Sequence, residues 1–198
     1  MGRTAIYDED TILEAATAHI AAHGGRASVA ALARSIGAPS GSIYHRFASR
    51  DALIAAVWLR ALRSFQGDFL AALDHPDVDQ AALAAARHVP EWCAESLDQA
   101  MVLHRYRIED LVATWPAELA PDRDTLNAEL FASLRRHSAN RYGSASGSAL
   151  DRTTFALVDV PGAAVRRFLD RHEAPPPWSV DAVGSAALAI LRDDRDHR

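Results

Sequence analysis

Apolar residues recur along most of this chain at intervals of three and four positions, and no stretch shows the strict alternation typical of a β-strand. This spacing predicts an all-α fold. The breaks between helices are expected at glycine- or proline-rich points, namely 24–25, Pro116, Pro121, 143–148, Pro161 and 174–177. The expected helices cover residues 8–23, 29–36, 39–47, a fourth from residue 49, and then 79–96, 97–113, 122–142, 150–159, 161–172 and 179–193.

The stretch GAPSGSIYHRF, residues 37–47, places small or turn-forming residues directly before a cluster of large ones. Gly37 ends a helix of about two turns whose cap is Ser28. Ile43 and Phe47 lie four positions apart, so they share one face of the next helix and are expected to point inward. The opposite, leading face then carries short side chains, which lets a large partner approach closely.

The fourth helix carries two apolar stripes instead of one. Leu53 and Val57 belong to the first stripe, and Ile54, Trp58 and neighbouring apolar residues form the second. A helix that is apolar on two sides is buried between two bodies. We therefore expect a domain at residues 1–50 and a larger helical domain at residues 51–198.

Composition limits the class of protein. The chain has 198 residues, of which 49% are hydrophobic, and its only cysteine is Cys93, so no internal disulfide is expected. No apolar run approaches the roughly 20 residues that a membrane span requires, and the first residues lack the apolar core of a signal peptide. A cytoplasmic protein with no membrane partner is expected.

Charge is unevenly distributed along the sequence. The net charge is −5, but residues 1–60 carry a balance of +1 against −6 for the remainder. Within residues 15–60 five arginines face a single acid, Asp51. A small basic segment on an acidic body is compatible with DNA binding.

Two short helices joined by a tight glycine-containing turn, with a longer helix before them, form a helix-turn-helix. Its second helix enters the major groove of DNA. The stretch SVAALARSIGAPSGSIYHRFASRDALI, residues 28–54, resembles the signature of the TetR family, and the specific part of the likeness covers residues 10–57. The resemblance implies an all-helical homodimer that binds double-stranded DNA at a palindromic operator. It further implies repression of transcription until a small molecule binds the C-terminal domain.

The resemblance also assigns residues to the DNA contact. Arg50 stands where the family usually has lysine, Arg46 occupies a common histidine position, and Pro39 replaces a usual serine cap. Because the tip of the helix carries only short side chains, we expect DNA shape and phosphate placement to carry much of the specificity. The implied DNA-binding residues are Ser28, Pro39, Ser40, Gly41, Ser42, Tyr44, His45, Arg46 and Arg50.

The C-terminal part carries weaker signals. Aromatic, methionine and histidine side chains near two expected helices could line an apolar effector pocket. The last apolar helices could pair with a second subunit as a four-helix bundle. The expected pocket residues are Trp58, Trp92, Met101, His104, Tyr106 and Trp115. The expected dimer residues are Phe155, Val158, Val165, Phe168, Val183, Ala187 and Ile190.

Other functions stay open at this point. A transcriptional activator or a regulator that needs no ligand would have the same sequence features. A helical ligand carrier or enzyme with a vestigial DNA-binding module is a further alternative, although no catalytic arrangement is visible. His88, Glu91, Cys93 and His104 match no zinc spacing, so no metal or cofactor is expected. Pro161 either kinks one helix or begins another, with Asp159 as its cap.

Overall fold

The computed structural model describes residues 8–106, 111 and 115–193, and throughout this part of the chain the regular elements are helical. Packing divides the chain into two compact units, Met1–Leu62 with Asp98–Arg123 and Arg63–Leu97 with Asp124–Arg198. The expected all-α fold is therefore confirmed. Residues 1–50 lie inside the first unit, and the domain boundary expected after residue 50 stays a prediction.

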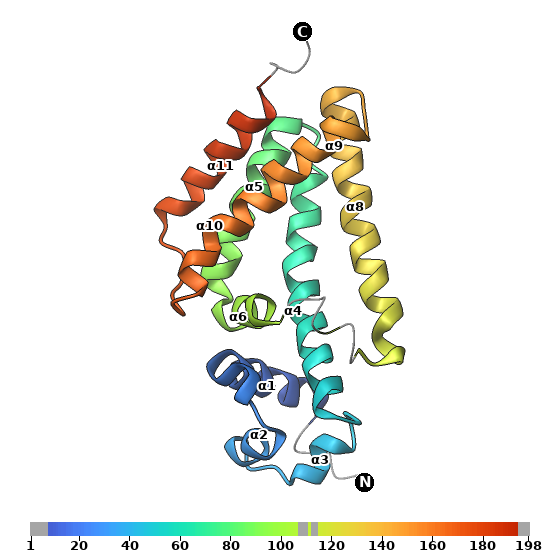
Figure 1. Ribbon diagram of the computed structural model, residues 1–198, viewed down its shortest axis with the longest axis vertical. Helices are drawn as coiled ribbons and strands as arrows, with labels where there is room; N and C mark the ends of the chain where they lie inside the picture. The colour runs from blue at the N-terminus through green and yellow to red at the C-terminus, as the bar shows by residue number, and fades with distance from the viewer. Residues whose placement is uncertain (1–7, 107–110, 112–114, 194–198) are drawn as a thin grey trace. The chain divides into compact units, whose positions relative to one another are not determined.

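The first unit contains the three N-terminal helices, the first half of α4 and most of α6 (Figure 1). Asp8 caps α1, because its Oδ1 accepts a hydrogen bond from the Thr11 amide at 2.8 Å. Gly24 ends α1 with φ +55°, a conformation that favours glycine. The elements are α1 Glu9–His23, η1 Gly24–Arg26, α2 Val29–Ser35, α3 Ser40–Tyr44, α4 Arg50–Leu73, α6 Leu97–Arg105 and the short turn η2 Ala117–Leu119.

The core of the first unit is formed by residues at helical spacing on each element. Both apolar stripes expected on α4 are buried, as Val57 and Ile54 illustrate at 0% and 3% exposure. Ser49 caps this helix by accepting from the Ala52 amide at 3.0 Å. Other buried members of this core are Ile12, Ala16, Ile20, Leu32, Ile43, Leu53, Trp58 and Ala61.

The second unit contains the later helices. Helix α5 packs against α10 and α11, and Figure 1 shows these three helices side by side. Gly184 permits this closeness, because a Cβ at this position would lie 2.8 Å from Leu83 Cδ1. The elements are the second half of α4, α5 Val78–Glu95, most of α8 Ala120–Tyr142, α9 Gly147–Thr154, the π-helical turn η3 Phe155–Asp159, α10 Val160–Leu169 and α11 Trp178–Leu191.

Two expected breaks at proline are not breaks. Pro121 lies in the first turn of α8, where the missing N–H costs little. Pro161 lies in a helical run that continues from α9 through η3 into α10, and Asp159 makes no capping hydrogen bond. The Val160 amide donates to the Phe155 carbonyl five residues back, so a wider π turn accommodates the proline.

The helix expected over residues 97–113 is described only in part. Helix α6 covers Leu97–Arg105, and residues 107–110 and 112–114 of the expected helix lie outside the described residues. None of the helices in the described part of the chain is both long and apolar enough to cross a membrane.

Candidate nucleic-acid interface

Helix α3 presents a slim outer face over a buried inner one. Ile43 and Phe47 are 1% and 6% exposed, so the inner face is anchored in the core as the sequence predicts. Ser40 and Gly41 are exposed, and a Cβ added to Gly41 would meet no atom within 4 Å. Nothing in the described part of this chain therefore covers the leading turn of α3.

Tyr44 lies at the end of the same helix and is 51% exposed. A large aromatic residue at such exposure is free to contact a partner through its hydroxyl and its ring edge. His45, the next residue, is also exposed. The arrangement places a hydroxyl and an imidazole beside the slim turn, which are groups that can donate to phosphate oxygens.

The ends of α3 differ in detail from the expectation. Pro39 has φ −62° and ψ 134°, so it is extended and precedes the helix, which begins at Ser40. Pro39 provides no side-chain cap. The Arg46 guanidinium donates from Nη1 to the Ser42 carbonyl at 3.3 Å and thus lies along the helix. Arg46 must leave this contact if it is to reach a phosphate.

Ser28 is exposed and caps α2, because its Oγ accepts from the Ala31 amide at 3.1 Å. Its hydroxyl hydrogen is not needed for that cap. A serine at a helix N-terminus can accept from the backbone and donate to a phosphate at the same time. The predicted phosphate contact is compatible with this geometry.

Arg50 lies at the head of α4 but points back to the turn before α2. Its Nε donates to the Ala27 carbonyl at 2.9 Å, and its Nη2 donates to the Gly25 carbonyl at 3.0 Å. The remaining Nη1 lies 3.8 Å from Asp51 Oδ1. The guanidinium fork therefore holds backbone carbonyls, a contact that sequence spacing could not reveal because Arg50 and Ala27 are 23 positions apart.

The six residues expected to line a pocket do not form one group. Trp58, Tyr106 and Trp115 are linked in the first unit, since Trp58 Nε1 donates to the Tyr106 carbonyl at 2.9 Å and the two indole rings meet edge to face. Met101 and His104 also belong to this unit, whereas Trp92 belongs to the second. Their role in ligand binding stays a prediction.

An aromatic cluster surrounds Trp92 in the second unit. The Phe65 ring lies 5.3 Å from Trp92 and 5.2 Å from His88, measured between ring centroids, and it stacks with Phe69 at 5.7 Å. The sequence did not lead us to expect Phe65, Phe69 and His88 as partners of Trp92. The helical spacing of Phe65 and Phe69 and of His88 and Trp92 was the available signal.

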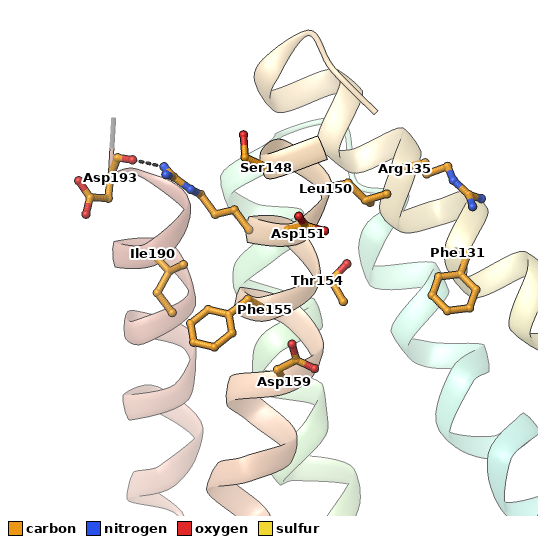
Figure 2. Close-up of a pocket in the computed structure, with 11 residues that line it drawn as sticks. Phe131, Arg135, Ser148, Leu150, Asp151, Thr154, Phe155, Asp159, Ile190 and Asp193 are labelled. Atoms are coloured by element: carbon orange, nitrogen blue, oxygen red, sulfur yellow. Dashed lines mark hydrogen bonds between the residues drawn. The ribbon is translucent and has the colours of Figure 1, made fainter. Parts of the chain in front are cut away.

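A groove of about 900 Å³ lies at the surface of the second unit between α8, α9, η3 and α11 (Figure 2). Phe131 and Phe155 line it and are 50% and 51% exposed. Ile190 also lines the groove, together with the charged side chains of Arg135 and Asp159. None of the six expected pocket residues lines it.

The expected dimer residues fall into two groups by burial. Phe155 is exposed, and Val158 and Ile190 are half-buried. The other four, Val165, Phe168, Val183 and Ala187, are buried within the chain itself. The four buried residues can contribute to an interface only by holding the surface residues in place. The assignment of the whole set to a dimer stays a prediction.

Cys93 offers no nucleophile. Burial raises the pKa of its thiol to about 12, so the group stays neutral. Within the described residues no group of three histidine, cysteine or carboxylate side chains is placed to hold a metal ion.

Comparison with known proteins gives one family match. Residues 12–57 match the model described as bacterial regulatory proteins of the tetR family. No curated protein sequence matches the chain.

Solved structures give further matches. The fatty acid degradation regulator FadR from Bacillus halodurans is 17% identical with a TM-score of 0.70, over 95% of this chain and 100% of that chain. PfmR, a TetR family transcriptional regulator from Thermus thermophilus, is 21% identical with a TM-score of 0.66, over 91% and 97%. A TetR-family regulator from Bordetella parapertussis is 20% identical with a TM-score of 0.65, over 97% and 98%. At these identities the likeness concerns the fold.

Proposed function

We propose that this chain, whose residues 12–57 match the tetR family of bacterial regulatory proteins, represses transcription from a palindromic operator until a small, largely apolar effector releases it. The family that residues 12–57 match consists of regulatory proteins, so we propose no enzymatic activity for the chain. An activator or a ligand-independent regulator is the alternative. Binding to chromosomal DNA would place the protein in the cytoplasm.

The observation that best supports DNA binding is the shape of the exposed face of α3. Its exposed turn at Ser40 and Gly41 is slim enough for the major groove, while Ile43 and Phe47 anchor it. Ser28, Tyr44 and His45 would then grip phosphates on either side. With short side chains at the tip, DNA shape carries much of the specificity.

Selection of bound duplexes from a random DNA pool tests this proposal. The salt concentration should be about 150 mM, because lower salt strengthens non-specific binding. We expect an enriched palindrome, and we expect Tyr44→Ala to abolish the enrichment. Tyr142→Ala provides the control, since Tyr142 belongs to the second unit. Absence of any enriched sequence with a folded wild-type protein would refute DNA-sequence recognition.

A homodimer follows from a palindromic operator, because two recognition helices about 34 Å apart read successive turns of DNA. The exposed Phe155 and the half-buried Val158 and Ile190 are the part of the expected interface that a second copy could cover. Phe155→Asp should shift the protein towards monomer in sedimentation at micromolar concentration. Tyr44→Asp, which alters an equally exposed aromatic residue in the first unit, should leave the dimer intact.

For the effector, the aromatic cluster of Phe65, His88 and Trp92 offers apolar surface in the second unit. Gln66, which follows Phe65 in α4, is buried, and its Oε1 has no hydrogen-bond partner in the described structure. Fatty acids form a natural first panel, given the name of the Bacillus halodurans neighbour. Release of labelled operator, measured by fluorescence anisotropy, would identify an effector.

Helix α4 contributes residues to both units, so an effector-induced shift could travel along it to the helix-turn-helix. Trp58→Phe removes the indole N–H that binds the Tyr106 carbonyl. With the effector at the cluster of Phe65, His88 and Trp92 and not at Trp58, we expect this variant to bind effector with nearly unchanged affinity but to release DNA less readily. Unchanged coupling would refute this route.

A further inference from the structure

The turn that leads into α2 is closed by a backbone carbonyl that accepts two hydrogen bonds. The Gly24 carbonyl accepts the Ala27 amide at 2.9 Å and the Tyr106 hydroxyl at 3.1 Å. A carbonyl oxygen has two lone pairs, so both are used here. Tyr106 reaches this turn from 82 positions further along the chain.

Tyr106 is itself held in place. It directly follows α6, its amide donates to the Val102 carbonyl at 3.1 Å, and its own carbonyl accepts from Trp58 Nε1 at 2.9 Å. The Tyr106 backbone is therefore held by the Val102 carbonyl of α6 and by the Trp58 side chain of α4. The Tyr106 hydroxyl, at the far end of the side chain, donates to the Gly24 carbonyl. Tyr106 therefore links the end of α6 to the turn before α2, where the helix-turn-helix begins.

The turn Gly24–Ala27, which Tyr106 holds, is followed directly by Ser28, a proposed phosphate contact. Ser28 follows Ala27 directly and caps α2, so the path of residues 24–27 determines where the Ser28 hydroxyl lies. Arg50 holds the same turn through the Gly25 and Ala27 carbonyls. The two side chains of Tyr106 and Arg50 thus fix the turn from both of its ends.

We propose that Tyr106 is a positioning residue for DNA binding, whose hydroxyl fixes the turn Gly24–Ala27 and thereby places Ser28 against a DNA phosphate. The proposal rests on the proposed function and adds that the end of α6 takes part in it. Tyr106 itself does not touch DNA. Its effect on affinity passes through the Gly24 carbonyl.

Tyr106→Phe tests the role, because it removes one oxygen and leaves the ring. We expect the equilibrium dissociation constant for the selected operator to rise about threefold to tenfold, the effect of one lost neutral hydrogen bond. Tyr142→Phe is the matched control, since its hydroxyl donates to the Leu191 carbonyl at 2.7 Å in the second unit. That variant should bind the operator like the wild type.

A double-mutant cycle separates positioning from general weakening. If Tyr106 acts through Ser28, the loss of affinity caused by Ser28→Ala should shrink by at least about threefold in the Tyr106→Phe background. Tyr44→Phe combined with Tyr106→Phe serves as the reference cycle. Because Tyr44 lies on α3, the loss of affinity caused by Tyr44→Phe should be the same in the wild-type and Tyr106→Phe backgrounds. Thermal unfolding of each variant verifies that the protein is folded.

The outcomes are distinct. Weakened binding with coupling to Ser28 alone supports the role. Operator affinity unchanged in Tyr106→Phe, or equal coupling to Ser28 and Tyr44, overturns it while the proposed function stands. If the wild-type protein enriches no duplex, the proposed function fails, and the positioning role fails with it.

Discussion

The Arg50 guanidinium donates from Nε to the Ala27 carbonyl across 2.9 Å, although the family resemblance assigns Arg50 to a DNA phosphate. A second donor, Nη2, reaches the Gly25 carbonyl at 3.0 Å. Two carbonyls held by one planar fork fix the direction of the turn between α1 and α2. We therefore expect Arg50 to serve DNA binding mainly through this turn.

Arg50→Lys distinguishes the two roles. Lysine keeps the positive charge but cannot reproduce the fork, so we expect operator affinity to fall about fivefold to tenfold, in proportion to one or two lost hydrogen bonds. Fluorescence anisotropy with the selected operator measures the change. Arg60→Lys, which alters a surface ion pair with Asp10, should bind normally. Wild-type affinity in Arg50→Lys would instead indicate a simple charge contact with phosphate.

The salt dependence of Arg50→Gln gives a second test of the same question. Loss of one phosphate contact in each half-site would reduce the slope of log K against log salt by about 1.8. We expect a smaller reduction, because the guanidinium is engaged by the protein. A reduction of the full size would contradict the turn-holding role.

Gly24→Ala should destabilise the protein by about 1 to 2 kcal/mol, because alanine tolerates a positive φ poorly. Gly24 has φ +55°, and an added Cβ would lie 2.7 Å from Arg105 Nη1. Gly25→Ala is the neighbouring control, since its Cβ would meet no atom within 4 Å. Urea unfolding of both variants measures the difference, and equal stabilities would refute the strain.

Asp79→Asn should lower the stability of the protein at neutral pH by about 1 to 3 kcal/mol, between the values for exposed and buried ion pairs. Asp79 Oδ1 accepts from Arg141 Nη1 at 2.6 Å, and the Arg141 side chain is only 10% exposed. Its Oδ2 accepts from the Arg192 guanidinium. Asp74→Asn, in a more exposed pair with Arg136, should change the stability little.

The contribution of Asp79 to the stability of the protein depends on pH in a defined direction. Hydrogen bonds from Arg192 and Arg141 hold the pKa of Asp79 below its usual value of 3.8. Its contribution is therefore complete above the unfolded-state pKa and is lost as the pH falls through the lower folded-state pKa. The difference between wild type and Asp79→Asn should persist at pH 5 and shrink only in stronger acid.

His137 should destabilise the protein in a different pH range. Burial lowers the pKa of His137 from 6.5 to about 4, and its Nε2 has no hydrogen-bond partner in the described structure. Between these two values the unfolded chain binds a proton that the folded chain does not, so stability falls as the pH falls. We expect His137→Leu to flatten the decline between about pH 6.5 and pH 4, by up to about 1.4 kcal/mol per pH unit.

The control for that experiment is His75→Leu, because His75 is exposed. Urea unfolding at a series of pH values measures both variants. His75→Leu should follow the wild-type decline. If His137→Leu also followed it, His137 would be protonated in the folded protein and the burial argument would be wrong.

The sequence by itself determined the local features of this protein. The helical spacing, the caps at Ser28 and Ser49, and the stop at Gly24 depend on residues a few positions apart, so they were readable without a structure. The inward pair Ile43 and Phe47 follows from the same spacing. These features sufficed to identify the helix-turn-helix.

Only the tertiary structure decided which side chains meet over long distances. Arg50 meets Ala27 and Tyr106 meets Gly24 because separate helices bring them together, and no periodicity encodes such pairs. Packing also decided that Val165 is buried within the chain while Phe155 is exposed, although both belong to one apolar pattern. A pattern shows that a face is apolar, whereas its partner depends on how the helices are arranged in space.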